Sequence, residues 1–253
     1  MVSSEGGSRT GRTAVSHTAQ LPFLTATHVL SNADVVFDGI RGGTADLGWT
    51  IAVTRADGSG TRIHREDLVA NHRDLTYALL WGVFRDVSKV VRNPYEEVEV
   101  TDVNVDADLD TRVLEGRIAR VEARRHGDWT GIDEGDRVRV AAGGTLPLRV
   151  HVRPTAGSDA RRDSVRVDAF VPRRGKATRG RVDLAGGASR RAGDVGSFDE
   201  LVRSIEGQAS GNSVGGSFHF AGRGGAGSSR IEPAETASTV RGRFTVDVRV
   251  MRG

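Results

Sequence analysis

A chain of 253 residues can bury one large hydrophobic core or two small ones. Its apolar residues make up 37% of the chain and its aromatics only 5%, while 33 glycines separate short valine-rich runs. This composition is typical of β-sheets joined by many turns. The absence of cysteine excludes disulfides, thiolate metal sites and a cysteine nucleophile.

The charge is balanced rather than strongly basic. Lys89 and Lys176 are the only lysines, so 34 of the 36 basic residues are arginines, and 33 acidic residues offset them to a net charge of +3. We see no basic stripe interleaved with aromatics, and we therefore expect no nucleic-acid partner. No apolar stretch is long enough to span a membrane, and residues 1–20 lack the apolar segment of a signal peptide.

The first half of the chain predicts an α+β portion. We expect residues 1–18 to be a flexible polar lead-in, and residues 21–30 form the first apolar patch. Alternating apolar residues on either side of the turn "ADGSG" predict a hairpin over 44–67. An amphipathic helix follows, capped by Asn71 or Asp74 and ended by "NP" at 93–94, with one apolar face made of Leu75, Leu79, Val83, Val87 and Val90.

From residue 95 onward the pattern becomes β. The alternation over 95–110 breaks its parity between Val100 and Val103, which predicts a bulge. "SFDELVRSIEG" (197–207) predicts a short helix that begins with a capping box and ends at a glycine. We interpret 221–235 as a loop. The remaining strands are expected at 116–124, 136–141, 146–153, 163–171, 181–185, 214–220 and 238–251.

The three tryptophans are dispersed along the chain. We interpret Trp49 and Trp81 as core residues, because both lie among alternating or helically spaced apolar residues. Trp129 lies in a glycine-flanked turn, where exposure would make it a hint of a binding surface.

"GNSVG" (211–215) matches the G-x-S-x-G pattern of a serine nucleophile. That motif needs an apolar strand before the serine and a helix after it, whereas here "GQAS" precedes Ser213 and the strand-like "GGSFHF" follows. His219 lies in that strand, but nothing marks it as the base that a catalytic serine needs. We therefore interpret Ser213 as a loop residue entering a strand.

Three further patterns point to cofactors or metals. "GRGGAG" (222–227) matches a dinucleotide fingerprint but is followed by no helical pattern, so we expect a hairpin loop. The histidines (17, 28, 64, 72, 126, 151 and 219) show no helical metal-ligand spacing. Alternate acidic residues at 102–110 could bind calcium weakly, although a solvated strand face is the simpler interpretation. We assign no catalytic, cofactor-binding or metal-binding residue.

Several stretches, in this order, resemble the C-terminal region of bacterial proteins that carry a SpoIVB-type serine peptidase domain. The likeness covers residues 20–250. The stretches are "LPFLTATHVLSNADVVFDGIRGGTADLGWTI" (21–51), "NPYEEVEVTDVNVDADLD" (93–110), "EGDRVRV" (134–140), "LRVHVRP" (148–154), "VPRRGKATRGRVDLAGG" (171–187), "SFDELVRSIEG" (197–207) and "TVRGRFTVDVRV" (239–250).

The resemblance implies that this chain has a function but no catalytic activity of its own. The family keeps its catalytic serine in a Ser-Gly-Ser-Pro element far upstream, and no such element exists here. We therefore expect a non-catalytic, extracytoplasmic module that positions the peptidase domain or binds an extracytoplasmic protein. The alternative is a stand-alone secreted module that binds a polymer or a cell-surface protein. The expected fold is mainly β, with an α+β portion over 19–108 and an immunoglobulin-like sandwich over 109–253, and with one long and one short helix.

Overall fold

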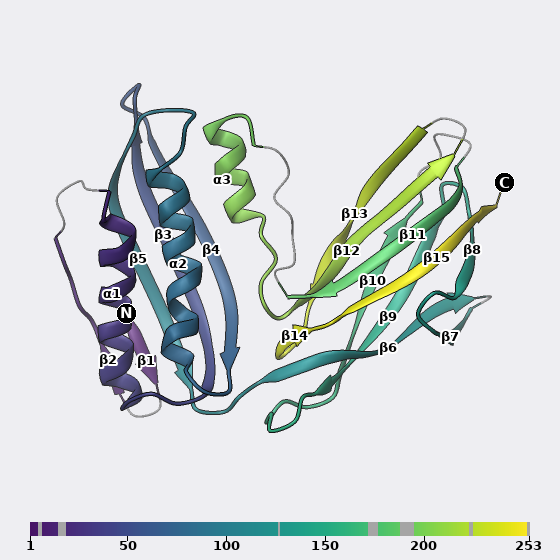
Figure 1. The fold of residues 1–253 in the computed structure, drawn as a ribbon, viewed down its shortest axis with the longest axis horizontal. Coiled ribbons are helices and arrows are strands. Elements are labelled where there is room, and N and C mark those ends of the chain that lie inside the picture. The colour runs from purple at the N-terminus through teal and green to yellow at the C-terminus, as the bar shows by residue number, and fades with distance from the viewer. Residues whose placement is uncertain are drawn as a thin grey trace. The chain divides into compact units, whose positions relative to one another are not determined.

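The computed structural model describes residues 1–4, 7–14, 19–125, 127–171, 177–187, 195–222 and 225–251. Strands account for about 54% of the chain and helices for about 19%, which confirms the mainly β fold class. The chain forms two compact units (Figure 1). Unit 1 is Met1–Val113 with Arg191–Gln208, and unit 2 is Leu114–Arg190 with Ala209–Gly253. The boundary lies close to the one expected at 108, but the short helix at 197–207 belongs to the first unit.

Unit 1 is a five-stranded sheet with helices packed on one face (Figure 1). The strand order is β2-β1-β5-β3-β4, with β1 and β5 parallel and the other pairs antiparallel. The strands are β1 (Val2–Ser4), β2 (Gly7–Arg9), β3 (Gly43–Arg55), β4 (Gly60–Asn71) and β5 (Val98–Asp110), and the helices are α1 (Leu21–Phe37), α2 (Leu75–Val91) and α3 (Phe198–Glu206).

Most local features of unit 1 agree with the sequence prediction. The β3–β4 hairpin turns at Gly58, whose positive φ of 81° suits a residue without Cβ. The bulge in β5 lies at Thr101, since Val100 pairs with Val53 and Asp102 with Ala52. Asp74, rather than Asn71, caps α2 by accepting a hydrogen bond from the Tyr77 amide.

Two features of unit 1 differ from the prediction. Residues 2–4 and 7–9 form strands at the edge of the sheet, where a flexible lead-in was expected, because β1 pairs with the central β5 and buries Val2. The apolar patch at 21–30 belongs to α1, a second long helix with Pro22 in its first turn. Its exposed face also carries Phe23 and Val35, so the sequence shows no clear amphipathic stripe.

The core of unit 1 lies between the sheet and the helices. One face of β3 buries Leu47, Trp49 and Ile51 against α2, and α3 adds Phe198, Leu201 and Ile205 to the same core. Ser197 caps α3 by accepting from the Glu200 amide, and Gly207 follows its end, as the capping-box spacing predicts. A segment between two strands of unit 2 therefore completes the core of unit 1.

Unit 2 is a sandwich of two five-stranded sheets around one core (Figure 1). One sheet has the order β10-β9-β6-β14 with β7 paired to β6, and the other has the order β13-β12-β11-β15-β8. The strands are β6 (Glu115–Arg125), β7 (Asp128–Ile132), β8 (Arg137–Ala141), β9 (Thr145–Pro154), β10 (Asp163–Phe170), β11 (Ala177–Gly186), β12 (Ser213–Gly222), β13 (Gly225–Glu235), β14 (Thr239–Arg241) and β15 (Arg243–Met251).

The strand order of the sandwich differs from that of an immunoglobulin domain. In an immunoglobulin sandwich the first, second, fifth and fourth strands lie side by side in that order in one sheet, whereas the corresponding strands of unit 2 follow the order β7-β6-β9-β10. Here β11, β12 and β13 are sequential neighbours in one sheet, and β9 and β10 are sequential neighbours in the other. The core between the sheets is built mainly from valine, with Leu148, Leu184 and Phe218 among its largest buried side chains.

Three details of unit 2 correct the sequence interpretation. The interval 221–235, expected as a loop, contains β13, an edge strand that tolerates Pro233 next to a register shift. Trp129 lies in β7 and not in a turn, paired in register with Arg124. The strand expected at 238–251 is divided into β14 and β15 at Gly242, which has a positive φ of 104°.

Candidate functional site

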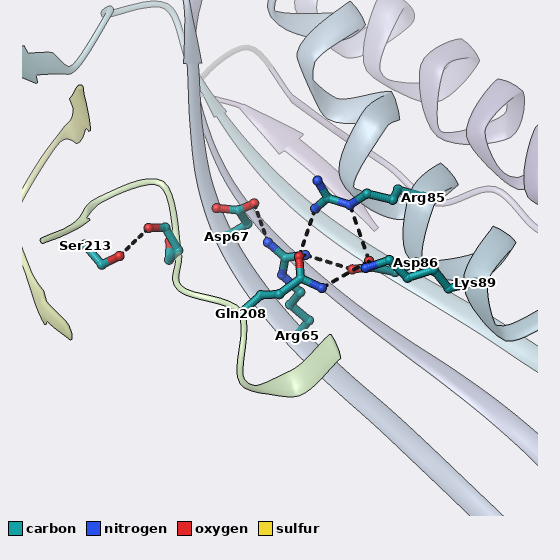
Figure 2. Close-up of polar contacts among 8 residues, drawn as sticks. Arg65, Asp67, Arg85, Asp86, Lys89, Gln208 and Ser213 are labelled. Carbon is teal, nitrogen blue, oxygen red and sulfur yellow. Dashed lines mark hydrogen bonds and ion pairs between the residues drawn. The ribbon is translucent and has the colours of Figure 1, made fainter. Parts of the chain in front are cut away.

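Ser213 is the first residue of β12, and its hydroxyl is engaged within its own turn (Figure 2). The side chain is 1% exposed, and Oγ donates to the carbonyl oxygen of Ser210 at 2.6 Å. A nucleophilic serine needs an accessible Oγ that donates to a base. The hydrogen bond to Ser210 instead closes the turn that leads into β12, which agrees with the loop-to-strand interpretation.

His219 lies on the outer face of the second sheet, beside a different serine. Its Nε2 is 2.7 Å from Oγ of Ser217 and 3.7 Å from Oδ2 of Asp183. In a serine triad the two ring nitrogens have separate partners, one bonding the serine and the other the acid. Because both partners here approach the same nitrogen, this trio does not have the geometry of a proton relay.

The acidic strand 102–110 presents its carboxylates to solvent on the side of the sheet opposite the helices. The amino group of Met1 donates to Asp106 at 2.8 Å, and Arg112 pairs with Asp110. Within the described ranges, no group of three or more histidine, aspartate or glutamate side chains is arranged to hold a metal ion. The alternate acidic side chains of the strand are exposed, which is the arrangement of a solvated strand face.

The other sequence motifs resolve into local structure. In the glycine-rich stretch 222–227, Gly222 at the end of β12 pairs with Gly225 at the start of β13, and a strand follows instead of a helix, while residues 223 and 224 lie outside the described residues. Among the described histidines, His28 lies beside Thr13, His64 beside Glu66, His151 beside Glu122 and His219 beside Ser217. His17 and His126 lie outside the described residues.

A buried ion-pair network joins β4 to α2 in unit 1 (Figure 2). Arg65 donates from Nη1 to Asp86 Oδ2 at 2.8 Å and from Nη2 to Asp67 Oδ2 at 3.1 Å. Arg65 is 2% exposed and Asp86 is fully buried, and the guanidinium lies 5.0 Å from the centre of the Trp49 ring. Because these charges are enclosed, the network can hold elements together but offers no reacting group to a substrate.

The same network fixes the chain just after α3. Oε1 of Gln208 accepts from Arg65 at 2.8 Å and from Arg85 at 3.2 Å, while Lys89 donates to Asp86 at 3.2 Å (Figure 2). Arg55, the last residue of β3, makes a second anchor for this segment. Together the two anchors hold both ends of α3 on unit 1.

Arg55 is that second anchor. It binds Glu96 through two hydrogen bonds, at 2.9 and 2.7 Å, and Asp199 of α3 through a third at 2.8 Å. The hydrogen bond with Glu96 holds the pKa of Arg55 above its usual range, and the same bond lowers the pKa of Glu96. The bidentate pair with Glu96 orients the guanidinium group, and the third hydrogen bond, to Asp199, fixes the position where α3 begins.

Three aromatic rings lie in a row on the outward side of α2, and we call them the α2 aromatic row. Tyr77 and Trp81 meet edge to face with ring centres 5.7 Å apart, and Trp81 and Phe84 do so at 6.0 Å. Trp81 is 53% exposed and Tyr77 52%. Two large exposed aromatics side by side are unusual on a surface that has no partner.

The exposure of Trp81 shows that its interpretation as a core residue is wrong, whereas the same interpretation of Trp49, 2% exposed, is confirmed. Two residues correspond to about 200° around a helix, so Trp81 lies nearly opposite Leu79. The sequence did contain this signal, since Tyr77, Trp81 and Phe84 share a spacing of four and three that is out of phase with the buried stripe.

The outer face of the first sheet of unit 2 carries a charged cluster around Glu122. Its carboxylate contacts Arg120 at 3.0 Å, Arg149 at 3.5 Å and His151 at 3.0 Å. The hydrogen bond from His151, helped by both arginines, holds the pKa of Glu122 below its usual range. Arg149 also stacks on Trp129, with its guanidinium carbon 4.1 Å from the ring centre.

Comparison with known proteins yields no relative. No family model matches the chain, and neither a curated protein nor a solved structure matches it significantly. None of the helices in the described part of the chain combines the length and apolarity needed to cross a membrane. The α2 aromatic row and the Glu122 cluster are two surfaces of the described residues whose geometry favours binding.

Proposed function

We propose that this chain is the non-catalytic C-terminal module of a SpoIVB-type serine peptidase, and that it positions the peptidase domain outside the cytoplasm by binding it through the α2 aromatic row. The resemblance of ordered stretches over residues 20–250 supports the family. The single observation that carries a binding role is the exposure of Trp81 and Tyr77 in one continuous row.

The chemistry of the row suits a protein partner. Tryptophan and tyrosine are enriched among the residues that dominate binding energy at protein interfaces, since each buries a large rigid ring at a small entropic cost. Exposed Arg73 and Arg85 flank the row along the helix and supply a charged rim. Phe84, half-buried beneath Trp81, supports the ring from below.

The test is binding between this chain and the SpoIVB-type peptidase domain encoded with it. We expect association that Trp81→Ala weakens about 30-fold or more, the size of a hot-spot loss of 2 kcal/mol. Phe23→Ala is the matched control, because Phe23 is an equally exposed aromatic on α1. No association, or an equal loss from both substitutions, would contradict the proposal.

The genomic sequence before Met1 provides a second, independent test of the family. An open frame that leads back into a Ser-Gly-Ser-Pro peptidase domain and a signal peptide would support the assignment. A stop codon and a ribosome-binding site immediately before Met1 would favour a stand-alone protein instead.

The alternative function is a secreted module that binds a polymer or a cell-surface protein. The observation that favours it is the platform formed by Trp129 and Arg149 beside Glu122, because a half-buried ring with fixed polar groups suits contact with a polymer. Retention on a cell-wall matrix that is lost in Trp129→Ala and kept in Trp81→Ala would support this alternative over the first.

A further inference from the structure

Three arginines stand side by side across the outer face of the second sheet of unit 2. Arg179 of β11 pairs in register with Arg249 of β15, and Arg249 pairs in register with Arg139 of β8. All three side chains are exposed, while the neighbouring Val248 and Val138 point into the core. Adjacent strands lie about 4.8 Å apart, so this arginine row extends over about 10 Å.

Within the described part of the chain, the arginine row has no counter-charge of its own. Like charges directly opposite each other destabilise a strand pair, and none of the three arginines forms an ion pair with another described residue. The next row of the same face differs, because Asp247 is in register with both Arg181 and Arg137. Asp247 therefore reduces the charge of its own row to +1, whereas the three arginines of the adjacent row carry +3.

A cleft of about 420 Å³ lies at this position. Arg137, Arg179, Asp247 and Arg249 line it, together with Gly180 and Val248. Its volume falls within the usual range of ligand sites. The uncompensated arginines thus border a hollow that a ligand can enter.

We propose that this face of the sheet binds a linear polymer that carries phosphate groups, with Arg179 and Arg249 in the cleft and Arg139 on the adjacent strand each binding the oxygens of a phosphate. The guanidinium group presents a rigid fork of donors that matches a planar or tetrahedral oxyanion. Three positive charges in a row of about 10 Å favour a ligand with several regularly spaced negative charges over a single carboxylate. The proposal is independent of the α2 aromatic row and goes beyond the proposed function.

The polymer is expected to lack nucleobases. Proteins that bind single-stranded nucleic acid stack the bases on aromatic side chains. Along the described parts of β8, β11, β12 and β15, the phenylalanines Phe218, Phe220 and Phe244 pack in or against the core, and no tryptophan or tyrosine occurs. Arginines without a stacking platform suit a phosphate backbone alone.

Three arginines of the first sheet are paired with carboxylates. Arg120 and Arg149 bind Glu122, and Arg166 binds Asp168 at 3.1 Å. Arg166 is exposed on a strand of the same unit but is compensated by its own neighbour. It therefore serves as a matched control, because replacing it changes the net charge of the chain by the same amount.

The experiment measures binding of linear inorganic polyphosphate to the full chain over a series of NaCl concentrations. Three phosphate contacts give a log–log slope of affinity against salt of about −2 to −3 by counterion release. We expect Arg249→Gln to weaken binding about tenfold and to reduce the slope by about 1. Arg179→Gln is expected to act in the same way, and Arg166→Gln to change neither quantity. An unchanged melting temperature confirms that each variant is folded.

Three results would overturn the proposal. The first is no binding of polyphosphate at low salt. The second is an equal loss from Arg249→Gln and Arg166→Gln, which would mean diffuse attraction to a basic surface. The third is tighter binding of a single-stranded DNA of the same charge, which would assign the cleft to nucleic acid. Trp81→Ala should leave polyphosphate binding intact, so a failure here is distinct from a failure of the proposed function.

Discussion

Arg65 and Asp86 form a 2.8 Å ion pair between two side chains that are almost fully shielded from water. Removing one partner of a buried pair leaves the other charge uncompensated, which costs about 3–5 kcal/mol. We therefore expect Asp86→Ala to lower the free energy of unfolding by that amount, as measured by urea denaturation. Asp46→Ala, at an exposed position of β3, should change it by less than about 0.5 kcal/mol. A loss below about 1 kcal/mol in Asp86→Ala would contradict this role of the pair.

Glu122 gives the stability of the protein a defined dependence on pH. Its hydrogen bond with His151 lowers its pKa in the folded state, so its ionised form stabilises the fold above the unfolded pKa of about 4.3. This contribution is lost as the pH falls through the lowered folded value. We expect Glu122→Gln to reduce the loss of stability between pH 5 and pH 3, measured by denaturation at each pH. Glu134→Gln, at an exposed position of the same unit, should leave the profile unchanged.

The two tryptophans of unit 1 should respond to substitution in opposite ways. Trp49→Ala removes a buried ring beside Arg65 and should cost about 3–5 kcal/mol of stability. Trp81→Ala removes an exposed ring and should cost less than about 1 kcal/mol. Acrylamide should quench the fluorescence of Trp81 efficiently and that of Trp49 poorly. A large loss of stability in Trp81→Ala would show that the α2 aromatic row serves the fold and not a partner.

Ser213 should behave as a structural residue. Its hydroxyl closes the turn at Ser210, so Ser213→Ala should cost about 1 kcal/mol, the usual net contribution of one hydrogen bond. A fluorophosphonate probe, which labels activated serines, should not react with the chain. Labelling that disappears in Ser213→Ala would refute the assignment of this residue.

A fragment that ends at Val113 should not fold as a stable unit. It lacks α3, whose Phe198, Leu201 and Ile205 complete the core of unit 1. The uncovered apolar surface should bind a hydrophobic dye and promote aggregation. Adding a peptide of residues 195–208 should reduce the dye signal, because Arg55 and Arg65 supply its anchors. A fragment that unfolds cooperatively without the peptide would contradict this dependence.

The sequence predicts elements whose local signals agree with their surroundings. The buried stripe of α2, its cap at Asp74 and the capping box of α3 are each specified within a few residues. It does not predict α1, since apolar Phe23 and Val35 on the exposed side obscure the stripe. It also misses β13, because Pro233 is a strand breaker except at an edge.

A site that depends on strand register cannot be predicted from the pattern of one segment of the sequence. The arginine row joins residues from β8, β11 and β15, which are far apart in the chain and become neighbours only through a parallel and an antiparallel pairing. A search for a continuous basic stripe along the sequence cannot find such a row. Periodicity within one element, by contrast, contains the signal for the α2 aromatic row, although Trp81 was interpreted as a core residue.

The position of α3 between β11 and β12 also determines the order in which the protein can fold during synthesis. Domains of a growing chain commonly fold one after another from the N-terminus. Here β1 to β5 leave the ribosome well before the helix that covers their core, and strands β6 to β11 must emerge in between. Unit 1 can therefore complete its fold only after most of unit 2 has been synthesised. The speed of translation through residues 114–197 determines how long the part of its core that α3 covers stays exposed.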